Sequence, residues 1–178
     1  MIRNRRVLAV WAVAVGGLLA SCENAAPVVT LPEGEDFLGA DTVIMGGTTL
    51  ITDADGIRTA RLQFDTAFQW SDSTHQALRG VDLTVFNEDG SARATVRALR
   101  GRFEPDDQRL TANGNVVLTV PLADRRLETE ELNYDPQREE LWSDSAFVML
   151  EEGERYEGTA FTSDLGFQNF RVSGVAGR

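Results

Sequence analysis

The residue best placed to do chemistry is Cys22, which ends the sequence Leu-Ala-Ser-Cys and is the only cysteine of the chain. It follows an uncharged apolar run, residues 7–19, and that run follows a short start that carries three arginines. This order is typical of a secretory signal. Its last four residues match the bacterial lipobox, in which the chain is cut before the cysteine and the cysteine is acylated. We therefore predict a lipoprotein signal peptide over residues 1–21 and a lipid anchor at Cys22.

A plain secretory signal, or a short anchor helix that happens to end in cysteine, is the alternative interpretation. The apolar run is too short to span a bilayer as a helix, which takes about 20 residues. A single myristoyl chain holds a protein on a membrane only marginally, whereas two signals hold it stably. A multiply acylated Cys22 would fix the chain to a membrane and leave no free thiol for disulfide or thiol chemistry.

The charge balance excludes some partners. The chain has 17 basic residues, all of them arginine, against 28 acidic residues. Removal of the signal takes away three arginines, so the mature chain keeps 14 basic residues and a formal charge of −14. Nucleic-acid binding needs clustered positive charge, and an anionic membrane surface attracts basic segments. We therefore expect no nucleic-acid binding, and membrane attachment through the lipid alone.

The rest of the sequence divides into a tether and one domain. Residues 22–38 contain Pro27, Pro32, Gly34 and several acids, which favours an extended tether. The β-prone residues 28–31 could instead form a first edge strand. Residues 39–178 are long enough for one domain with its own core.

From about residue 40 the pattern is that of β-structure. Short runs rich in Val, Leu, Phe and Thr alternate with turn signals such as Asp-Gly and Asn-Gly, whose residues accept the positive φ of tight hairpins. Only residues 60–70 could carry a helical turn or two. We predict an all-β domain of stacked antiparallel strands. The predicted strands are residues 43–45, 57–68, 81–86, 94–103, 116–120, 127–134, 141–142, 147–150, 156–161 and 170–172, with turns at 53–56, 87–90, 105–107, 113–114, 135–136 and 151–153.

The chain also repeats itself. Residues 102–110 align with residues 133–141 at an offset of 31, and both stretches carry an aromatic residue two before proline and a leucine five after it. A fixed period of this size suggests stacked supersecondary units, here of two strands and two turns, which bury their apolar faces against one another. Ordinary similarity between hairpins is the alternative.

Few residues suit catalysis or metal binding. His75, the only histidine, stands among polar residues, and without a histidine pair or a free cysteine we expect no zinc site. Residues 53–56 resemble part of a calcium loop but lack its remaining ligands. Phosphate loops, nucleophile elbows and dinucleotide fingerprints are missing. We expect no enzyme activity, no metal and no cofactor, although the many carboxylates leave a glycosidase-like acid pair open.

Several segments together resemble the LptC family, the membrane-attached component of lipopolysaccharide transport, which shares a β-jellyroll with LptA and the OstA-like domains. The resemblance covers residues 39–175 and rests on the order and spacing of its motifs. Residues 110–118 (LTANGNVVL) resemble a strand entered through a Gly-Asn-Val turn, residues 127–136 (LETEELNYDP) resemble the family's L-x-T-[DE]-x-L-x-Y-[DN] segment, and residues 142–144 (WSD) and 156–164 (YEGTAFTSD) resemble its S-D and G-x-G-F-x-[SA]-D elements.

Two departures from the family pattern stand out. A lipobox stands where LptC proteins commonly have a transmembrane helix, which leaves the membrane of residence open. Ala160 stands at the second glycine of the G-x-G element, a harmless change because alanine is also small.

The resemblance implies a slightly open β-jellyroll whose inner face carries acyl chains. Strands of alternating hydrophobicity place apolar side chains on one face, so the sequence itself provides such a face, which is first of all a core. Besides Val81, the candidate lipid-binding residues are Phe64, Phe68, Leu83, Val85, Phe103, Val116, Leu118, Val120, Leu132, Tyr134, Phe147, Met149 and Phe161.

The resemblance also implies partners. Residues 41–51 would dock to an inner-membrane ABC transporter of the LptB/LptF/LptG type, and residues 147–172 to an LptA-like periplasmic protein, both by pairing of edge strands. The chain would stand on the periplasmic side of the envelope, anchored through Cys22 to the inner membrane, and pass lipopolysaccharide onward. A structural β-lipoprotein with a tightly packed inner face is one alternative, and a carbohydrate-active enzyme on a β-sandwich is another.

Arginines offer a second kind of lipid contact. Arg93, Arg97, Arg100 and Arg102 fall in one predicted strand, and residues 125–126 in a nearby turn. Arginine binds phosphate through two parallel hydrogen bonds, so these side chains could meet lipid phosphates. Pairing with surrounding Asp and Glu on a solvated face is the competing interpretation.

Overall fold

The computed structural model describes residues 39–165 and 167–174, and these residues form strands joined by tight turns. The predicted signal segment 1–21, Cys22 and the tether to residue 38 lie outside the described residues. The strands are β1 (Thr42–Thr52), β2 (Arg58–Gln69), β3 (Gln76–Phe86), β4 (Ala92–Glu104), β5 (Arg109–Val120), β6 (Arg125–Asp135), β7 (Glu140–Ser143), β8 (Phe147–Glu151), β9 (Glu154–Gly158), β10 (Ala160–Asp164) and β11 (Arg171–Ser173), with a 3₁₀ turn, η2 (Pro121–Ala123), before β6. The prediction of an all-β domain is confirmed.

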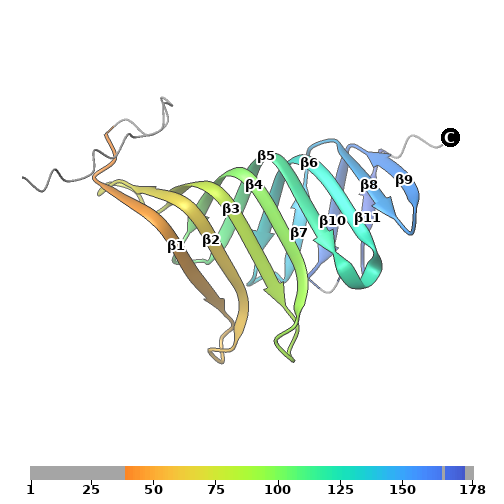
Figure 1. Cartoon of the computed structure of the whole chain (residues 1–178), viewed down its shortest axis with the longest axis horizontal. Coiled ribbons are helices and arrows are strands. Elements are labelled where there is room, and N and C mark those ends of the chain that lie inside the picture. Colours follow the sequence, from red (N-terminus) through yellow and green to blue (C-terminus); the bar gives the residue numbers. More distant parts are fainter. Residues whose placement is uncertain (1–38, 166, 175–178) are drawn as a thin grey trace, which may run out of the picture. The chain divides into compact units, whose positions relative to one another are not determined.

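These strands belong to one antiparallel sheet, in which β1 to β6 follow one another in sequence order (Figure 1). Beyond β6 the sheet divides. One half of β6, Asn133 to Asp135, pairs with β7, and the other half, Arg125 to Thr129, pairs with β8. β9 continues the sheet from β8, whereas β10 and β11 continue it from β7.

The long strands change the phase of their alternation near their middles. In β2, inward Phe64 is followed by inward Ala67, and in β6, inward Leu127 is followed by inward Leu132. Side chains alternate along a regular strand, so an odd step between two inward residues requires an irregular backbone between them. The irregularities are register shifts at Arg97/Arg100 and Asn113/Val116 and positive φ at Gly46, Gly80, Gly114 and Asn115. We call the line that they form across the sheet the crease.

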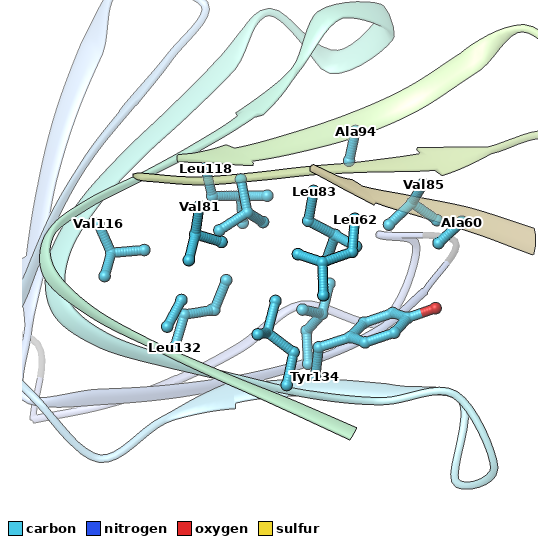
Figure 2. Close-up of a cluster of buried hydrophobic side chains, with 14 of the residues drawn as sticks. Ala60, Leu62, Val81, Leu83, Val85, Ala94, Val116, Leu118, Leu132 and Tyr134 are labelled. Atoms are coloured by element: carbon cyan, nitrogen blue, oxygen red, sulfur yellow. The ribbon is translucent and has the colours of Figure 1, made fainter. Parts of the chain in front are cut away.

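The crease divides the sheet into two layers. Layer 1 contains the halves of the long strands that carry Leu62 and Leu118, together with β8 and β9. Layer 2 contains the halves that carry Leu78 and Leu132, together with β7, β10 and β11. In Figure 2, Leu62 and Leu118 lie opposite Leu132 and Tyr134. The inner faces of the two layers therefore pack together, and their buried side chains form one core cluster.

The two stretches that align in the sequence form hairpins of the same geometry. The turns after β4 and β6 contain Gln108 (φ 56°) and Glu139 (φ 53°), which are equivalent positions in the alignment. Phe103 pairs with Leu110 across the first hairpin, and Tyr134 pairs with Leu141 across the second. The aromatic residue and the leucine that recur in the sequence are thus cross-strand neighbours on the inner face.

Three local predictions are wrong. Residues 156–161 do not form one strand, because β9 ends at Gly158 and pairs with β8, whereas β10 begins at Ala160 and pairs with β7. Residues 60–70 contain no helical turn, because β2 runs to Gln69 and gains a buried face against β1 and β3. Residues 113–114 do not form a hairpin turn. β5 continues through them, and the positive φ of Gly114 and Asn115 bends the strand at the crease instead.

Among the described residues, the outer strands of the sheet are β1, β9 and β11. The predicted edge 41–51 coincides with β1. The predicted edge 147–172 is wrong in part, because β8 lies between β6 and β9, and β10 lies between β7 and β11. Unpaired strand edges on the C-terminal side belong to β9 and β11.

Replacement of Gly80 by alanine should destabilise the domain, because Gly80 has a φ of +64° and an added Cβ would stand 1.9 Å from Asp65 Oδ2. The left-handed conformation costs a residue with a Cβ about 1–2 kcal/mol, and the collision adds to that cost. Gly90→Ala is the matched control, since Gly90 has a φ of +82° but open space around its Cβ position. Urea unfolding should show a greater loss for Gly80→Ala, by about 1 kcal/mol. Equal losses would show that the crease tolerates a side chain there.

Candidate functional site between the layers

The inner faces of the two layers form the candidate site. Every predicted lipid-binding residue is buried, and Phe64, the least buried of them, is 8% exposed. All but Phe68 lie in the core cluster. They come from β2 to β6, β8 and β10, so the fold brings together residues spread over about 100 positions of the sequence.

Phe68 is buried but lies outside the core cluster. The change of phase at the crease turns its neighbour Ala67 inward, and because adjacent side chains point to opposite faces, Phe68 points to the other face of layer 2. The prediction that Phe68 belongs to the inner face is therefore wrong.

Side chains fill the space between the layers. Leu83, Val116 and Leu118 have no exposed area. One of the larger hollows, of about 680 Å³, lies between turns of the two layers, at residues 52–55 on one side and residues 107–108 and 136–137 on the other. Another, of about 530 Å³, lies along β5, β6 and β8 and is lined in part by Val116 and Phe147. An acyl chain can enter the interior only if the layers part or side chains move.

The side of the two layers opposite the crease is where parting would occur, and we call it the mouth. No backbone hydrogen bond between the described residues joins the layers there. Side chains bridge it in three places: Thr52 N–H donates to Gln108 Oε1 (2.9 Å), Arg93 Nη1 donates to the Leu165 carbonyl (3.2 Å), and Arg125 Nη1 donates to the Phe167 carbonyl (3.5 Å). In the described part of the chain, the layers are thus continuous at the crease and held at the mouth only by side-chain contacts.

Tyr134 carries a polar atom in this apolar interior. Its side chain is 1% exposed, and its hydroxyl has no hydrogen-bond partner. Burial raises the pKa of Tyr134 to about 12, and the Thr59 hydroxyl acts in the other direction, although no hydrogen bond of normal geometry joins the two groups. Thr59, whose hydroxyl lies near that of Tyr134, lines the larger hollow.

An aromatic group lies between the layers at the C-terminal end of the sheet, where Phe147 and Phe161 pair with Thr129 and Ser143 near the crease. Phe161 stacks on Phe170 with ring centroids 5.2 Å apart, and Phe147 meets these rings edge-on at 5.4 and 6.4 Å. Arg125 lies over Phe170 at 4.8 Å from the ring centroid and pairs with Glu151. Sequence reasoning missed Phe170 and its neighbour Phe167, since the segment between β10 and β11 has no alternation to reveal an inward side.

Most of the arginines proposed for phosphate contact pair with acids instead. The ion pairs are Arg97 with Asp82 (3.0 Å), Arg102 with Glu104 (3.4 Å), Arg126 with Glu128 (2.9 Å) and Arg125 with Glu151. The first three are solvent-exposed and contribute little to stability. Arg125 differs, because its side chain is only 10% exposed.

The described residues hold no group of three or more potential metal ligands. Residues 53–56 form a hairpin turn, in which the Asp53 carboxylate accepts hydrogen bonds from the backbone of Asp55 and Ile57. In the same part of the chain, no helix is long and apolar enough to cross a membrane.

A family model described as "Lipopolysaccharide-assembly, LptC-related" matches residues 9–177. The chain belongs to this family. The LptC family serves lipopolysaccharide transport at the cell envelope and is not a family of enzymes, which agrees with the resemblance of residues 39–175 and with the all-β fold.

No curated protein sequence matches the chain. Among solved structures, the LptC-type chain is similar to LptH from Pseudomonas aeruginosa, described as the LptA homologous periplasmic component of the lipopolysaccharide transport device. The two share 9% sequence identity over 76% of this chain and 83% of that chain, with a TM-score of 0.30. This likeness is too low to carry an argument.

Replacement of Tyr134 by phenylalanine should leave stability near neutral pH unchanged or slightly higher, since it removes a buried hydroxyl that has no partner. It should also remove a loss of stability at alkaline pH. The pKa of Tyr134 is about 12 in the folded chain against 10.0 ordinarily, so the unfolded chain releases its proton first and stability falls as pH rises from about 10 to about 12.

Urea unfolding across that pH range measures the effect. Tyr156→Phe is the control, because it changes the other tyrosine of the chain, which is exposed. Tyr156→Phe should keep most of the alkaline loss and Tyr134→Phe should not. The same alkaline loss in both variants would show that Tyr134 is not protected by burial.

Proposed function

We propose that this chain is a membrane-attached LptC-type carrier that accepts lipopolysaccharide from an inner-membrane ABC transporter of the LptB/LptF/LptG type and passes it to an LptA-like periplasmic protein. The observation that supports this most directly is the apolar interior between two layers that, within residues 39–165 and 167–174, no backbone hydrogen bond joins at the mouth. The proposal also rests on membership of the LptC family.

The chemistry of the interior suits acyl chains. Burial of a methylene from water contributes about 0.8 kcal/mol, so several chains of one glycolipid bind strongly without any covalent step. Parting of the layers would break side-chain contacts at the mouth, such as the hydrogen bond from Thr52 to Gln108, but no strand ladder. The cost of opening is therefore within reach of the free energy that acyl burial provides.

The strand edges support transfer between partners. β1 at one end of the sheet and β9 and β11 at the other each leave one edge unpaired among the described residues. A partner with an unpaired strand can extend the sheet there by backbone hydrogen bonds. Docking of the transporter at β1 and of an LptA-like protein at β9 and β11 would align the three interiors.

The packed interior favours a second candidate function, that of a structural β-lipoprotein which assembles through the same edges and carries no lipid. Leu83, Val116 and Leu118 are fully buried by protein side chains. Both functions predict edge pairing, so only contact between lipid and the inner face separates them.

Photo-crosslinking from Leu118 separates the two functions. A photoreactive phenylalanine at Leu118, on the inner face, should give adducts with lipopolysaccharide, because acyl chains would lie against this residue. The same group at Thr119, the next residue of β5 and on the outer face, is the matched control and should give none. Adducts at neither position, or at both equally, would favour the scaffold.

The predicted anchor needs its own test. The wild-type chain should incorporate labelled palmitate in a bacterial host, and Cys22→Ser should abolish incorporation because no thiol remains. Ser21→Ala keeps the small residue that the lipobox requires and should incorporate the label normally. Absence of label from the wild type, or its retention in Cys22→Ser, would refute acylation of Cys22.

A further inference from the structure

The contacts at the mouth suggest where an acyl chain enters. Two of the three bridges, those from Arg93 and Arg125, end on the carbonyl groups of Leu165 and Phe167, between β10 and β11. Leu165 N–H donates to the Glu139 carbonyl (3.1 Å), just before β7, whereas the Phe167 N–H donates only within its own turn, to the Asp164 carbonyl (3.0 Å). Neither residue belongs to a strand ladder. This end of the mouth is therefore closed by side chains and an irregular segment, not by a ladder.

The side chains of that segment lie where a lipid tail would lie. Phe167 is 6% exposed and belongs to the core cluster. Phe170 packs against the cluster and contacts Phe147 and Phe161, two predicted lipid-binding residues of the inner face. We call Phe167 and Phe170 the aromatic plug.

The aromatic plug is held by a small set of contacts. Arg125 donates to the Phe167 carbonyl and covers the Phe170 ring at 4.8 Å. The Asp164 carboxylate accepts hydrogen bonds from Gln168 N–H at 2.9 Å and from Asn169 Nδ2 at 2.5 Å. Burial opposes ionisation of Asp164, but these hydrogen bonds outweigh it and lower the pKa of the carboxyl, so the segment keeps this cap at neutral pH.

The conformation of Phe167 adds strain. Its φ is +56°, in the left-handed region that a bulky side chain seldom adopts. Such strain persists only where surrounding contacts impose it, here the burial of the ring and the hydrogen bond from Arg125. Movement of Phe167 out of the core would relieve the strain and would break no strand pairing.

We propose that the aromatic plug occupies an acyl-binding subsite that runs inward from the mouth to Phe147 and Phe161, and that a lipid tail enters between the layers by displacing Phe167 and Phe170 from these two rings. This inference rests on the proposed function. It adds the place of entry and the residues that compete with the acyl chain for it.

The test compares variants that carry the photoreactive phenylalanine at Leu118. Phe170→Ala removes half of the aromatic plug and should raise the adduct yield with subsaturating lipopolysaccharide about tenfold. The reason is that the plug of the parent competes with the acyl chain for the subsite and so weakens lipid binding. Trp142→Ala is the matched control. Trp142 is an aromatic residue of β7 whose position pairs with outward Asn133 and Thr162, and its loss should leave the yield unchanged.

The outcomes separate the plug from the proposed function. Circular dichroism checks that both chains are folded. If the parent forms adducts and Phe170→Ala gives no higher yield, the proposed role of the aromatic plug is wrong, but the proposed lipid transport is not affected. No adducts in either would overturn both.

Hydrogen exchange of the wild-type chain provides the second measurement. Lipopolysaccharide should speed exchange at Gln168 and Asn169, whose amides now bond to Asp164, and not in the turn at residues 105–108. Faster exchange at 105–108 alone would place entry elsewhere and overturn the plug.

Discussion

The structure depends on one constraint, the crease at which long strands change the phase of their alternation. A strand that buries Phe64 on one side of the crease and Ala67 on the other contributes to both layers. Glycines at positive φ, such as Gly80 and Gly114, make this possible where a side chain would be strained or would collide. Because the crease supplies the continuous backbone connection between the layers, the opposite side needs no strand pairing to close it.

The consequence is a domain that is closed by packing but not by its backbone. Burial of Leu83, Val116 and Leu118 holds the layers together, and the contacts of Arg93, Arg125 and Thr52 cover the mouth. A sealed barrel would require the loss of a ladder before a lipid tail could enter. In the proposed function, the apolar surface that stabilises the closed state would exchange its protein partner for an acyl chain, as a carrier requires.

Much of this architecture follows from the sequence. The alternation of Val81, Leu83 and Val85 predicts their inward face, and the 31-residue repeat predicts that Phe103 and Tyr134 are equivalent, because hydrophobic period and turn chemistry are local properties. The placement of Phe68 could not be obtained in this way. A change of phase depends on backbone irregularities shared by several neighbouring strands, and an Asn-Gly pair inside β5 looks the same in sequence as one in a hairpin turn.

The aromatic plug escaped prediction for a related reason. Phe167 and Phe170 lie in a segment whose position is set by contacts with Arg93 and Arg125, which are distant in sequence. Periodicity says nothing about such a segment. The predicted edge at residues 147–172 is too broad for a similar reason. β7 and β8 pair with two halves of β6, and local sequence patterns do not reveal such a division of one strand between two partners.

Separation of the layers at the mouth can be measured directly by pulsed electron paramagnetic resonance. Spin labels at Ile57 in layer 1 and Gln137 in layer 2, both exposed, report the distance across the mouth in a chain that carries Cys22→Ser. Labels at Ile57 and Leu122 report a distance within layer 1. With lipopolysaccharide bound, the first distance should lengthen and the second should not change. An unchanged first distance on a chain with lipid bound would contradict the opening of the layers.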